Sequence, residues 1–291
     1  MENQQILDML GIKFKEIFDE DKKENKDRLV YRNFFTDYTS EHAQEVDVQL
    51  NLKDIQELTE QQKKENVKNI TTYIHDTFSL CFQITPQDIE DNLYLSKFTM
   101  YAKSLFNTYY QFLDFAASKV FNEAFDEENE KALCHPDHKN SFSEELSKES
   151  FQKAIIRIGE YKDSEGRLLK IVPKMLMVPP HLQFKAYDIC GFPAATTNSD
   201  INAIYPSYPY IFVNNYLEPD CTSWFLLTDA PEGLKHFIRE EDEVDSYFED
   251  KLDERGDKVI KTGNLNFRIT GRHSFGFTNP QCVFGSSGKG S

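Results

Sequence analysis

Residues 171–182 read Ile-Val-Pro-Lys-Met-Leu-Met-Val-Pro-Pro-His-Leu, an apolar run that ends in two prolines. The run closes a β-rich segment that begins at Leu168, so it predicts a strand. Proline is favoured in the first turn of a helix, and Pro179-Pro180 therefore predicts a helix start. The helix that follows has its apolar residues on one face: Leu182, Ala186 and Ile189.

Beyond this helix the chain changes to loops and short strands. Glycine and proline residues interrupt the sequence between residues 191 and 215. Residues 265–285 read Leu-Asn-Phe-Arg-Ile-Thr-Gly-Arg-His-Ser-Phe-Gly-Phe-Thr-Asn-Pro-Gln-Cys-Val-Phe-Gly. The predicted strands are Tyr210–Val213, Ser223–Thr228, Leu265–Phe275 and Gln281–Phe284. The final Gly285-Ser-Ser-Gly-Lys-Gly-Ser predicts a flexible tail.

An acidic segment lies between these strands. Residues 240–257 hold ten Asp or Glu residues against Lys251 and Arg255. The segment lacks the alternating Asp/Asn, central Gly and terminal Glu of a calcium loop, which favours a solvated edge over a Ca²⁺ site. Arg255-Gly-Asp predicts a loop tip in this segment.

Two helices are predicted before the quoted strand. The nearer one starts at Ser143 or Ser147 and runs to Tyr161, with apolar residues on one side. The other has a start signal at Thr85-Pro86 and then the strongest helical period in the chain. Its repeating residues are Leu95, Phe98, Ala102, Leu105, Tyr109, Phe112, Ala116 and Val120. A helix of about 35 residues would be roughly 50 Å long.

The first 84 residues contain a helix and a long arm. Residues 1–20 have helical spacing with a weak point at Gly11, and the charged run Lys22 to Arg28 ends the apolar pattern. Residues 31–84 predict two strands, with markers from Tyr31 to Tyr38 and from Thr71 to Ile84, that flank a polar tip at 40–69. Such a tip cannot bury much of itself, so it projects into solvent or lies on another molecule.

The composition limits the classes of function. The 291 residues have 39% hydrophobic side chains, enough for a core, and a formal net charge of -16. This charge argues against a DNA-binding protein, because DNA affinity depends on Lys and Arg. An acidic surface could line a DNA container without adhering to DNA, or it could serve solubility alone.

The cysteines and the hydropathy indicate a soluble protein. The five cysteines are widely spaced and include no C-x-x-C pair, so we expect reduced thiols. The N-terminus has no basic region followed by an apolar run, and no stretch reaches the ~20 apolar residues that span a bilayer. We therefore expect no export and no membrane partner.

The two quoted stretches resemble the major capsid proteins of tailed bacteriophages, and the chain is more closely similar to the phage Mu-type major head subunit family. The resemblance covers roughly residues 85–285. The remaining matching pieces are Phe121-Asn-Glu-Ala-Phe, Leu133-Cys-His-Pro-Asp-His, Asn202-Ala, Tyr216-Leu, Trp224-Phe-Leu-Leu-Thr-Asp and Phe237-Ile-Arg-Glu. The first 84 residues match by layout only.

The resemblance implies the Hong Kong 97 phage capsid fold, an α+β fold with five segments. They are an N-terminal arm (1–34), an extended hairpin loop (35–83), a peripheral domain with a long spine helix (84–145), an axial domain (146–236), and the second part of the peripheral domain with the tail (237–291). The implied function is that of a major capsid protein that self-assembles into hexamers and pentamers of an icosahedral shell.

The implied partners follow from that function. They are further copies of the chain, a portal protein, decoration proteins, a separate scaffolding protein, and packaged double-stranded DNA without sequence-specific contacts. We expect the scaffolding protein to be separate because only about thirty residues precede the hairpin loop. The implied location is the virion shell, assembled in the host bacterial cytoplasm. Alternatives are a bacterial nanocompartment shell of the same fold and an adaptor or tail protein.

Several residues are candidates for assembly contacts. Relatives that crosslink use a hairpin-loop lysine, for which Lys53, Lys63, Lys64 and Lys68 qualify by position only, although Mu-type relatives are not expected to crosslink. Trp224 is the single tryptophan and predicts a buried strand anchor or, alternatively, a ligand platform. Arg239 and Arg272 could form bidentate salt bridges between subunits, or pair within the chain.

One cluster could hold a metal. Cys134-His-Pro-Asp-His138 contains four zinc-competent side chains, but Pro136 makes the spacing cramped, and a turn after the spine helix is the favoured interpretation. A metal-dependent hydrolase around His135, Asp137 and His138 is the alternative. The chain has no phosphate-binding Gly loop, no G-x-S-x-G and no H-E-x-x-H motif, so we expect no catalytic residues, cofactor or bound metal, and no enzyme activity.

Overall fold

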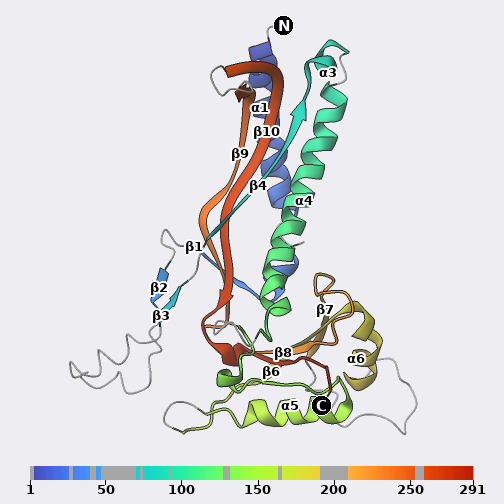
Figure 1. The fold of residues 1–291 in the computed structure, drawn as a ribbon, viewed down its shortest axis with the longest axis vertical. Coiled ribbons are helices and arrows are strands. Elements are labelled where there is room, and N and C mark those ends of the chain that lie inside the picture. The colour runs from blue at the N-terminus through green and yellow to red at the C-terminus, as the bar shows by residue number, and fades with distance from the viewer. Residues whose placement is uncertain are drawn as a thin grey trace, which may run out of the picture. The chain divides into compact units, whose positions relative to one another are not determined.

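The computed structural model divides into two compact units (Figure 1). It describes residues 3–25, 29–39, 44–46, 70–72, 75–91, 94–126, 132–162, 166–190, 209–252 and 259–290. The first unit comprises Met1–Asn33, Asp37–Asp114 and His236–Ser274. The second unit comprises Phe34–Thr36, Phe115–Lys235 and Phe275–Ser291.

The first helix of the first unit is longer than predicted. Helix α1 (Asn3–Asn25) continues through the first part of the charged run. Lys22 and Lys23 lie in its last turn, where their positive charges stabilise the helix by interacting with the negative end of its dipole. The predicted weak point, Gly11, lies inside α1. A Cβ at Gly11 would come within 2.6 Å of the Ser246 hydroxyl, so this glycine permits a close approach of strand β9.

The predicted 35-residue helix is two helices. The predicted cap is confirmed, because Thr85 and Asp88 form a capping box at the start of α3 (Pro86–Glu90). Helix α3 ends after five residues, and α4 (Tyr94–Asn122) is a separate helix of 29 residues. Asp88 also binds Lys97 Nζ at 2.5 Å, an ion pair that joins the two helices across the break.

The sheet of the first unit has the order β1-β9-β10-β4. Its strands are β1 (Thr36–Thr39), β4 (Asp76–Ile84), β9 (Leu234–Leu252) and β10 (Val259–Phe277). Strands β4 and β10 are antiparallel, with Phe82 opposite Phe267. The acidic run, which the sequence predicted as a solvated edge, is a regular strand up to Leu252 with exposed carboxylates. The predicted loop tip at Arg255 lies outside the described residues. Exposed Glu243 and Asp245 alternate with less exposed neighbours, the period of a strand.

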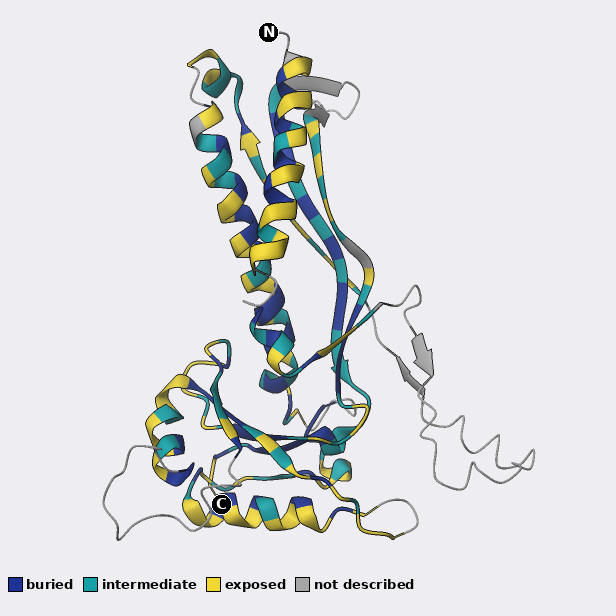
Figure 2. Ribbon diagram, turned by 180° about the vertical axis from the view of Figure 1, so that it is seen from behind, coloured by how far each residue is buried: buried dark blue, intermediate teal, exposed yellow. Residues whose placement is uncertain are grey.

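Aromatic side chains form the core of the first unit. The ring centroid of Phe14 on α1 lies 5.5 Å from that of Phe267 on β10 and 5.2 Å from that of Phe106 on α4. The apolar sides of α1 and α4 are buried and their other sides are exposed (Figure 2). These contacts fix both helices to the sheet.

The predicted two-stranded arm is confirmed only at β2 (Gln44–Val46) and β3 (Ile70–Thr72), because β1 and β4 lie at opposite ends of the sheet order and do not pair with each other. Strands β2 and β3 pair in antiparallel fashion, and most of the predicted polar tip lies outside the described residues. The predicted strand at Tyr31–Tyr38 is wrong in its first half, which forms a 3₁₀ helix, η1 (Val30–Asn33). The Asn33 side chain donates to the Val30 carbonyl, a local bond that favours a turn over a strand.

The second unit contains a sheet of order β5-β11-β8-β6-β7. Its strands are β5 (Ser141–Phe142), β6 (Pro173–Val178), β7 (Tyr210–Val213), β8 (Trp224–Thr228) and β11 (Val283–Ser286). Strand β8 is antiparallel to both of its neighbours, whereas β5 is parallel to β11 and β7 is parallel to β6. The predicted strand from Leu168 begins only at Pro173.

Two helices of the second unit share one apolar core with its sheet. They are α5 (Lys148–Gly159) and α6 (Gln183–Cys190), and α6 follows the short η4 (Pro180–Leu182). Phe151 of α5, Ile189 of α6 and Trp224 of β8 belong to this core. The next residue of β8, Phe225, points to the other side, where its ring centroid lies 5.2 Å from that of Phe121. The order of elements is the one that the Hong Kong 97 resemblance implies.

The predicted flexible tail is wrong for its described part. Gly285 and Ser286 belong to β11, because the Gly285 N–H donates to the Asn140 carbonyl. Gly290 N–H donates to the Ser143 carbonyl at 2.9 Å. Backbone pairing therefore orders a segment whose composition predicts flexibility. None of the described helices has the length and apolar character that crossing a bilayer requires.

Candidate functional site

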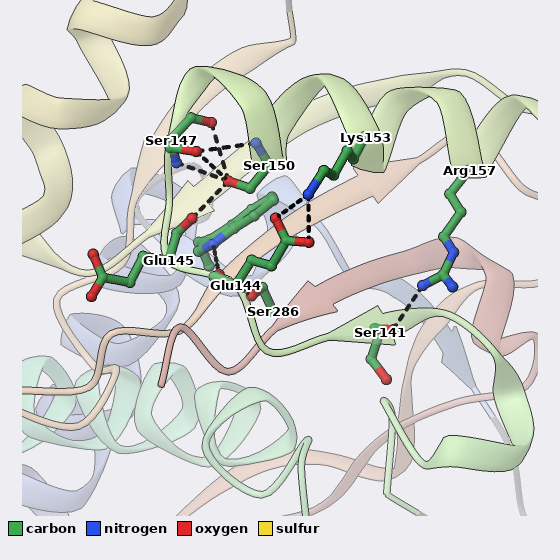
Figure 3. Close-up of polar contacts among 9 residues, drawn as sticks. Ser141, Glu144, Glu145, Ser147, Ser150, Lys153, Arg157 and Ser286 are labelled. Atoms are coloured by element: carbon green, nitrogen blue, oxygen red, sulfur yellow. Dashed lines mark hydrogen bonds and ion pairs between the residues drawn. The ribbon is translucent and has the colours of Figure 1, made fainter. Parts of the chain in front are cut away.

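A polar corner of the second unit lies where the chain passes from β5 into α5 (Figure 3). Ser147 caps α5, since its hydroxyl accepts from Ser150 N–H at 3.1 Å and Ser150 Oγ accepts from Ser147 N–H at 2.8 Å. Ser150 Oγ also donates to the Glu145 carbonyl. The capping box fixes the start of α5 at Ser147, one of the two starts, Ser143 and Ser147, that the sequence predicted.

Glu144 connects this corner to the sheet. Its main-chain carbonyl accepts from Trp224 Nε1 at 3.2 Å and from the Ser286 hydroxyl. Its carboxylate lies 2.8 Å from Lys153 Nζ of α5. Glu144 therefore ties β8, β11 and α5 together (Figure 3).

Asn140 holds the segment before this corner. Its side-chain Nδ2 lies 2.9 Å from three carbonyl oxygens, those of Leu133, Pro280 and Val283. Asn140 is fully buried, so these carbonyls have little access to water as an alternative donor. One amide thus joins the turn after α4 to the end of the chain.

A pocket of about 440 Å³ opens beside the corner, lined by Pro136, Lys139, Ser141 and Arg157. Arg157 Nη1 donates to the Ser141 carbonyl at 3.3 Å, which orients the guanidinium. Lys139 ends the turn η3 (Pro136–His138) in the left-handed conformation, with φ of 56°. Two exposed cations therefore lie at one pocket.

The first unit contains a chain of hydrogen-bonded polar groups, which we call the carboxylate–imidazole chain: Asp37, His236, His273 and Asp242. Its two histidines are buried, Asp242 is half-buried and Asp37 is exposed. His236 Nδ1 lies 2.8 Å from Asp37 Oδ1, and His273 Nε2 lies 2.9 Å from Asp242 Oδ1. Tyr109 of α4 donates to Asp242 Oδ1 at 2.7 Å. The chain thus links β1, β9, β10 and α4.

Burial and hydrogen bonding act in opposite directions on these groups. Burial lowers the pKa of His236, and the hydrogen bond to Asp37 opposes this only in part. Burial would raise the pKa of Asp37 and of Asp242, but hydrogen bonds from His236 and His273 outweigh it, so both pKa values lie below the usual value. The geometry supports ionised carboxylates at neutral pH.

Gly271 leaves room for the carboxylate–imidazole chain. A Cβ at this position would overlap the Asp242 carboxylate, the Tyr109 hydroxyl and the His273 ring. Any larger residue would have to displace at least one of them.

The structure places the predicted assembly residues in different surroundings. Trp224 is fully buried in β8, which confirms the strand anchor. Arg239 is exposed on β9, and Arg272 is half-buried on the neighbouring strand β10. Lys53, Lys63, Lys64 and Lys68 lie outside the described residues. The role of all these residues in assembly stays a prediction.

The cluster at residues 134–138 forms the turn that the sequence favoured. His135 Nδ1 accepts from Asp137 N–H at 3.3 Å, and His138 Nδ1 lies 3.2 Å from the Leu133 carbonyl. Cys134 is buried, and burial raises the pKa of its thiol. In the part of the chain that the structure describes, no group of three or more His, Cys, Asp or Glu residues is placed to hold a metal.

The sequence did not predict the histidine contact of the first unit or the Asn140 bonds and the pocket of the second unit. His236 and His273 are 37 positions apart and meet only because β9 and β10 are neighbours. Recognising residues 234–252 as a strand would have suggested the pairing. For Asn140 and for the pocket cations Lys139 and Arg157, no sequence signal was available.

The polar corner and the pocket belong to a region with known relatives. The family described as "Mu-like prophage major head subunit gpT" matches residues 139–217. The resemblance to Mu-type major head subunits is confirmed over this region. The matched residues include Lys139, Asn140 and Arg157, and the helices α5 and α6.

The chain is also similar to solved structures at low sequence identity. A Mycobacterium phage Adephagia structure has a TM-score of 0.49 at 11% identity, with 89% of each chain covered. The virus-like particle of Pyrococcus furiosus has a TM-score of 0.48 at 8% identity, covering 87% of this chain and 90% of that one. A Microbacterium phage Oxtober96 structure has a TM-score of 0.47 at 9% identity, covering 85% and 84%. No curated protein sequence matches the chain.

Proposed function

We propose that this chain is the major capsid protein of a tailed bacteriophage and forms the hexamers and pentamers of an icosahedral shell. The observation that carries the proposal is the match of residues 139–217 to the Mu-like major head subunit family. This region supplies α5, α6 and three strands of the sheet in the second unit, β5, β6 and β7.

The surface of the second unit supports contacts between copies. Large apolar side chains are exposed on it, among them Phe184 of α6 at 76% and Tyr210 of β7 at 68%. Strand β7 is also an edge of its sheet, and exposed edges are sites of pairing with another chain. Stable assemblies commonly bury 2,000 Å² or more per interface, and exposed apolar residues favour such burial.

The proposal includes the segments and partners that the resemblance implies. The arm (1–34) and the hairpin loop (35–83) would contact neighbouring copies, and the segment 146–236 would pack around the symmetry axes. A separate scaffolding protein, a portal protein and decoration proteins would complete the particle. The net charge of -16 suits a container in which packaged DNA is not bound tightly.

Electron microscopy of the expressed protein tests the proposal. The chain is purified alone and after co-expression with a candidate scaffolding protein, and both samples are imaged by negative stain. We expect closed spherical particles of uniform size in at least the co-expressed sample. Monomers at high concentration, or rings and tubes, would contradict a shell protein. Particles that hold a folded protein cargo and no DNA in the native host would instead support a nanocompartment.

A further inference from the structure

The pocket of the polar corner contains two positive charges, those of Lys139 and Arg157, for which the described residues supply no carboxylate partner. Among the ion pairs of the described residues, none includes Lys139 or Arg157, whereas Lys153 one turn away pairs with Glu144. Arg157 uses one donor on the Ser141 carbonyl, and a guanidinium has five. The pocket therefore presents unused donors and net positive charge to a ligand.

The pocket is positively charged on a chain that is acidic as a whole. The chain has 49 acidic residues against 33 basic ones, so copies that approach each other repel on average. An assembly of many copies needs places where this repulsion is reversed. A pocket with two cations is suited to that role, because carboxylates form charge-assisted hydrogen bonds with Lys and Arg.

Strand β9 carries a matching acidic surface. Glu243 is exposed on β9, and no cation pairs with it among the described residues. Asp245, two positions further, is also exposed and lies 3.2 Å from Arg268. Alternate residues of a strand lie roughly 7 Å apart on the same side, so both carboxylates are presented together.

We propose that the pocket around Lys139 and Arg157 binds acidic side chains of β9, Glu243 first among them, from a second copy of the chain. The inference rests on the proposed function, since it names a contact between capsid subunits. DNA phosphate is the competing ligand. Two cations on a chain of net charge -16 favour a single carboxylate contact over a polyanion, which requires many Lys and Arg residues.

The test compares assembly of Lys139→Gln and Arg157→Gln with that of the wild type and of Lys148→Gln. Lys148 is exposed on the same helix as Arg157 but does not line the pocket, so it is a matched control for lost charge. Assembly rates are followed by light scattering over a series of NaCl concentrations. We expect each pocket variant to assemble roughly tenfold more slowly than the wild type at low salt, with a weaker salt dependence, and the control to match the wild type.

Three further variants separate a lost contact from a folding defect. Arg157→Lys keeps the charge, and we expect it to assemble close to the wild-type rate. Glu243→Lys should slow assembly, and combining it with Lys139→Glu and Arg157→Glu should restore at least half of the wild-type rate, because the charges are exchanged. Trp224 fluorescence verifies that the second unit is folded in each variant.

The outcomes are distinct. Wild-type rates in both pocket variants, or no rescue by the charge exchange, overturn the inference while leaving the proposed function intact. Normal assembly with reduced retention of DNA also overturns it and assigns the pocket to phosphate. If the wild type forms no particles under any condition, the proposed function itself fails.

Discussion

His236 Nε2 and His273 Nδ1 lie 3.0 Å apart in the first unit, with the two imidazole rings nearly parallel. A carboxylate lies at each outer end, Asp37 beside His236 and Asp242 beside His273. Buried groups that exchange hydrogen bonds in series stabilise each other's position, and loss of one leaves its neighbours without a partner. This arrangement couples the stability of the sheet to pH.

The first prediction concerns the stability of the fold at acidic pH. Because burial lowers the pKa of His236 below that of an unfolded histidine, the unfolded state binds a proton at higher pH, and the free energy of unfolding falls as the pH drops below about 6.5. The lowered pKa values of Asp37 and Asp242 add a second loss of stability below about pH 4, where the unfolded carboxylates become protonated first. Urea unfolding followed by circular dichroism at pH 7, 6, 5, 4 and 3 measures both losses.

The variant His236→Asn isolates the histidine contribution. We expect it to lower the free energy of unfolding at pH 7 by roughly 2 kcal/mol, since Asp37 loses a hydrogen bond, and to flatten the profile between pH 7 and 5. His181→Asn is the control, because His181 is exposed in η4. An unchanged slope in His236→Asn would contradict the assignment.

The second prediction concerns Asp114, whose carboxylate accepts from Tyr31 N–H at 2.9 Å. Burial raises the pKa of Asp114 to about 6, although backbone N–H groups oppose the rise. The folded state therefore binds the proton more tightly than the unfolded state, and stability decreases as the pH rises from about 4 to 6. We expect Asp114→Asn to raise the free energy of unfolding at pH 7 by roughly 2 kcal/mol and to leave it unchanged at pH 4.

The same denaturant titrations measure this difference, with Asp19→Asn on the exposed side of α1 as the control. An Asn variant that is less stable than the wild type at pH 7 would show that the carboxylate stabilises the fold, contrary to the prediction.

The third prediction concerns Asn140. Its two amide protons serve three carbonyls at 2.9 Å, and Asn140→Ala removes all of these bonds at a buried site. We expect the free energy of unfolding to fall by roughly 2–4 kcal/mol, because buried acceptors are left without donors. Unfolding monitored by Trp224 fluorescence reports it, since Trp224 is the only tryptophan and lies in the second unit. Asn215→Ala, at an exposed position, should change stability by less than about 0.5 kcal/mol.

The fourth prediction concerns the polar segment 40–69. Its composition provides too few apolar residues for a core of its own, so deleting it should leave a soluble, folded subunit. We expect this variant to form no closed shells by electron microscopy, because the segment would contact neighbouring copies. Normal particles would show that the segment 40–69 is dispensable for closure of the shell.

Local signals in the sequence predicted many elements of the fold. The Thr85-Pro86 start, the period of α4 and the Ser147 cap are encoded within a few residues of each element, and the structure has all three. The break between α3 and α4 was missed, because the start signal at Thr85-Pro86 and the period that begins at Leu95 were assigned to one helix. Periodicity reports which face is buried and does not report where a helix is interrupted.

The elements that the sequence did not predict depend on pairing between residues far apart in the chain. The segment 240–252 has too many charges to be recognised as a strand by hydrophobicity, yet pairing with neighbouring strands makes it regular. Ser286 is similar, because its glycine- and serine-rich surroundings predict a tail, whereas its backbone pairs with Phe142 and Trp224. The pocket forms where Lys139, after the turn η3, lies near Arg157 of helix α5, and the sequence of neither element predicts that they meet.

The anchored carboxyl end of the chain has a practical consequence. Thr222 Oγ1 donates to the Ser287 carbonyl, and Gly290 N–H donates to Ser143, so the last described residues are held beside the start of α5. A fluorescent label or an enzyme joined to the last described residues would therefore start from a location beside the start of α5. A fusion at this end would report on, or obstruct, that side of the second unit, which makes it a poor choice for purification and a useful one for distance measurements.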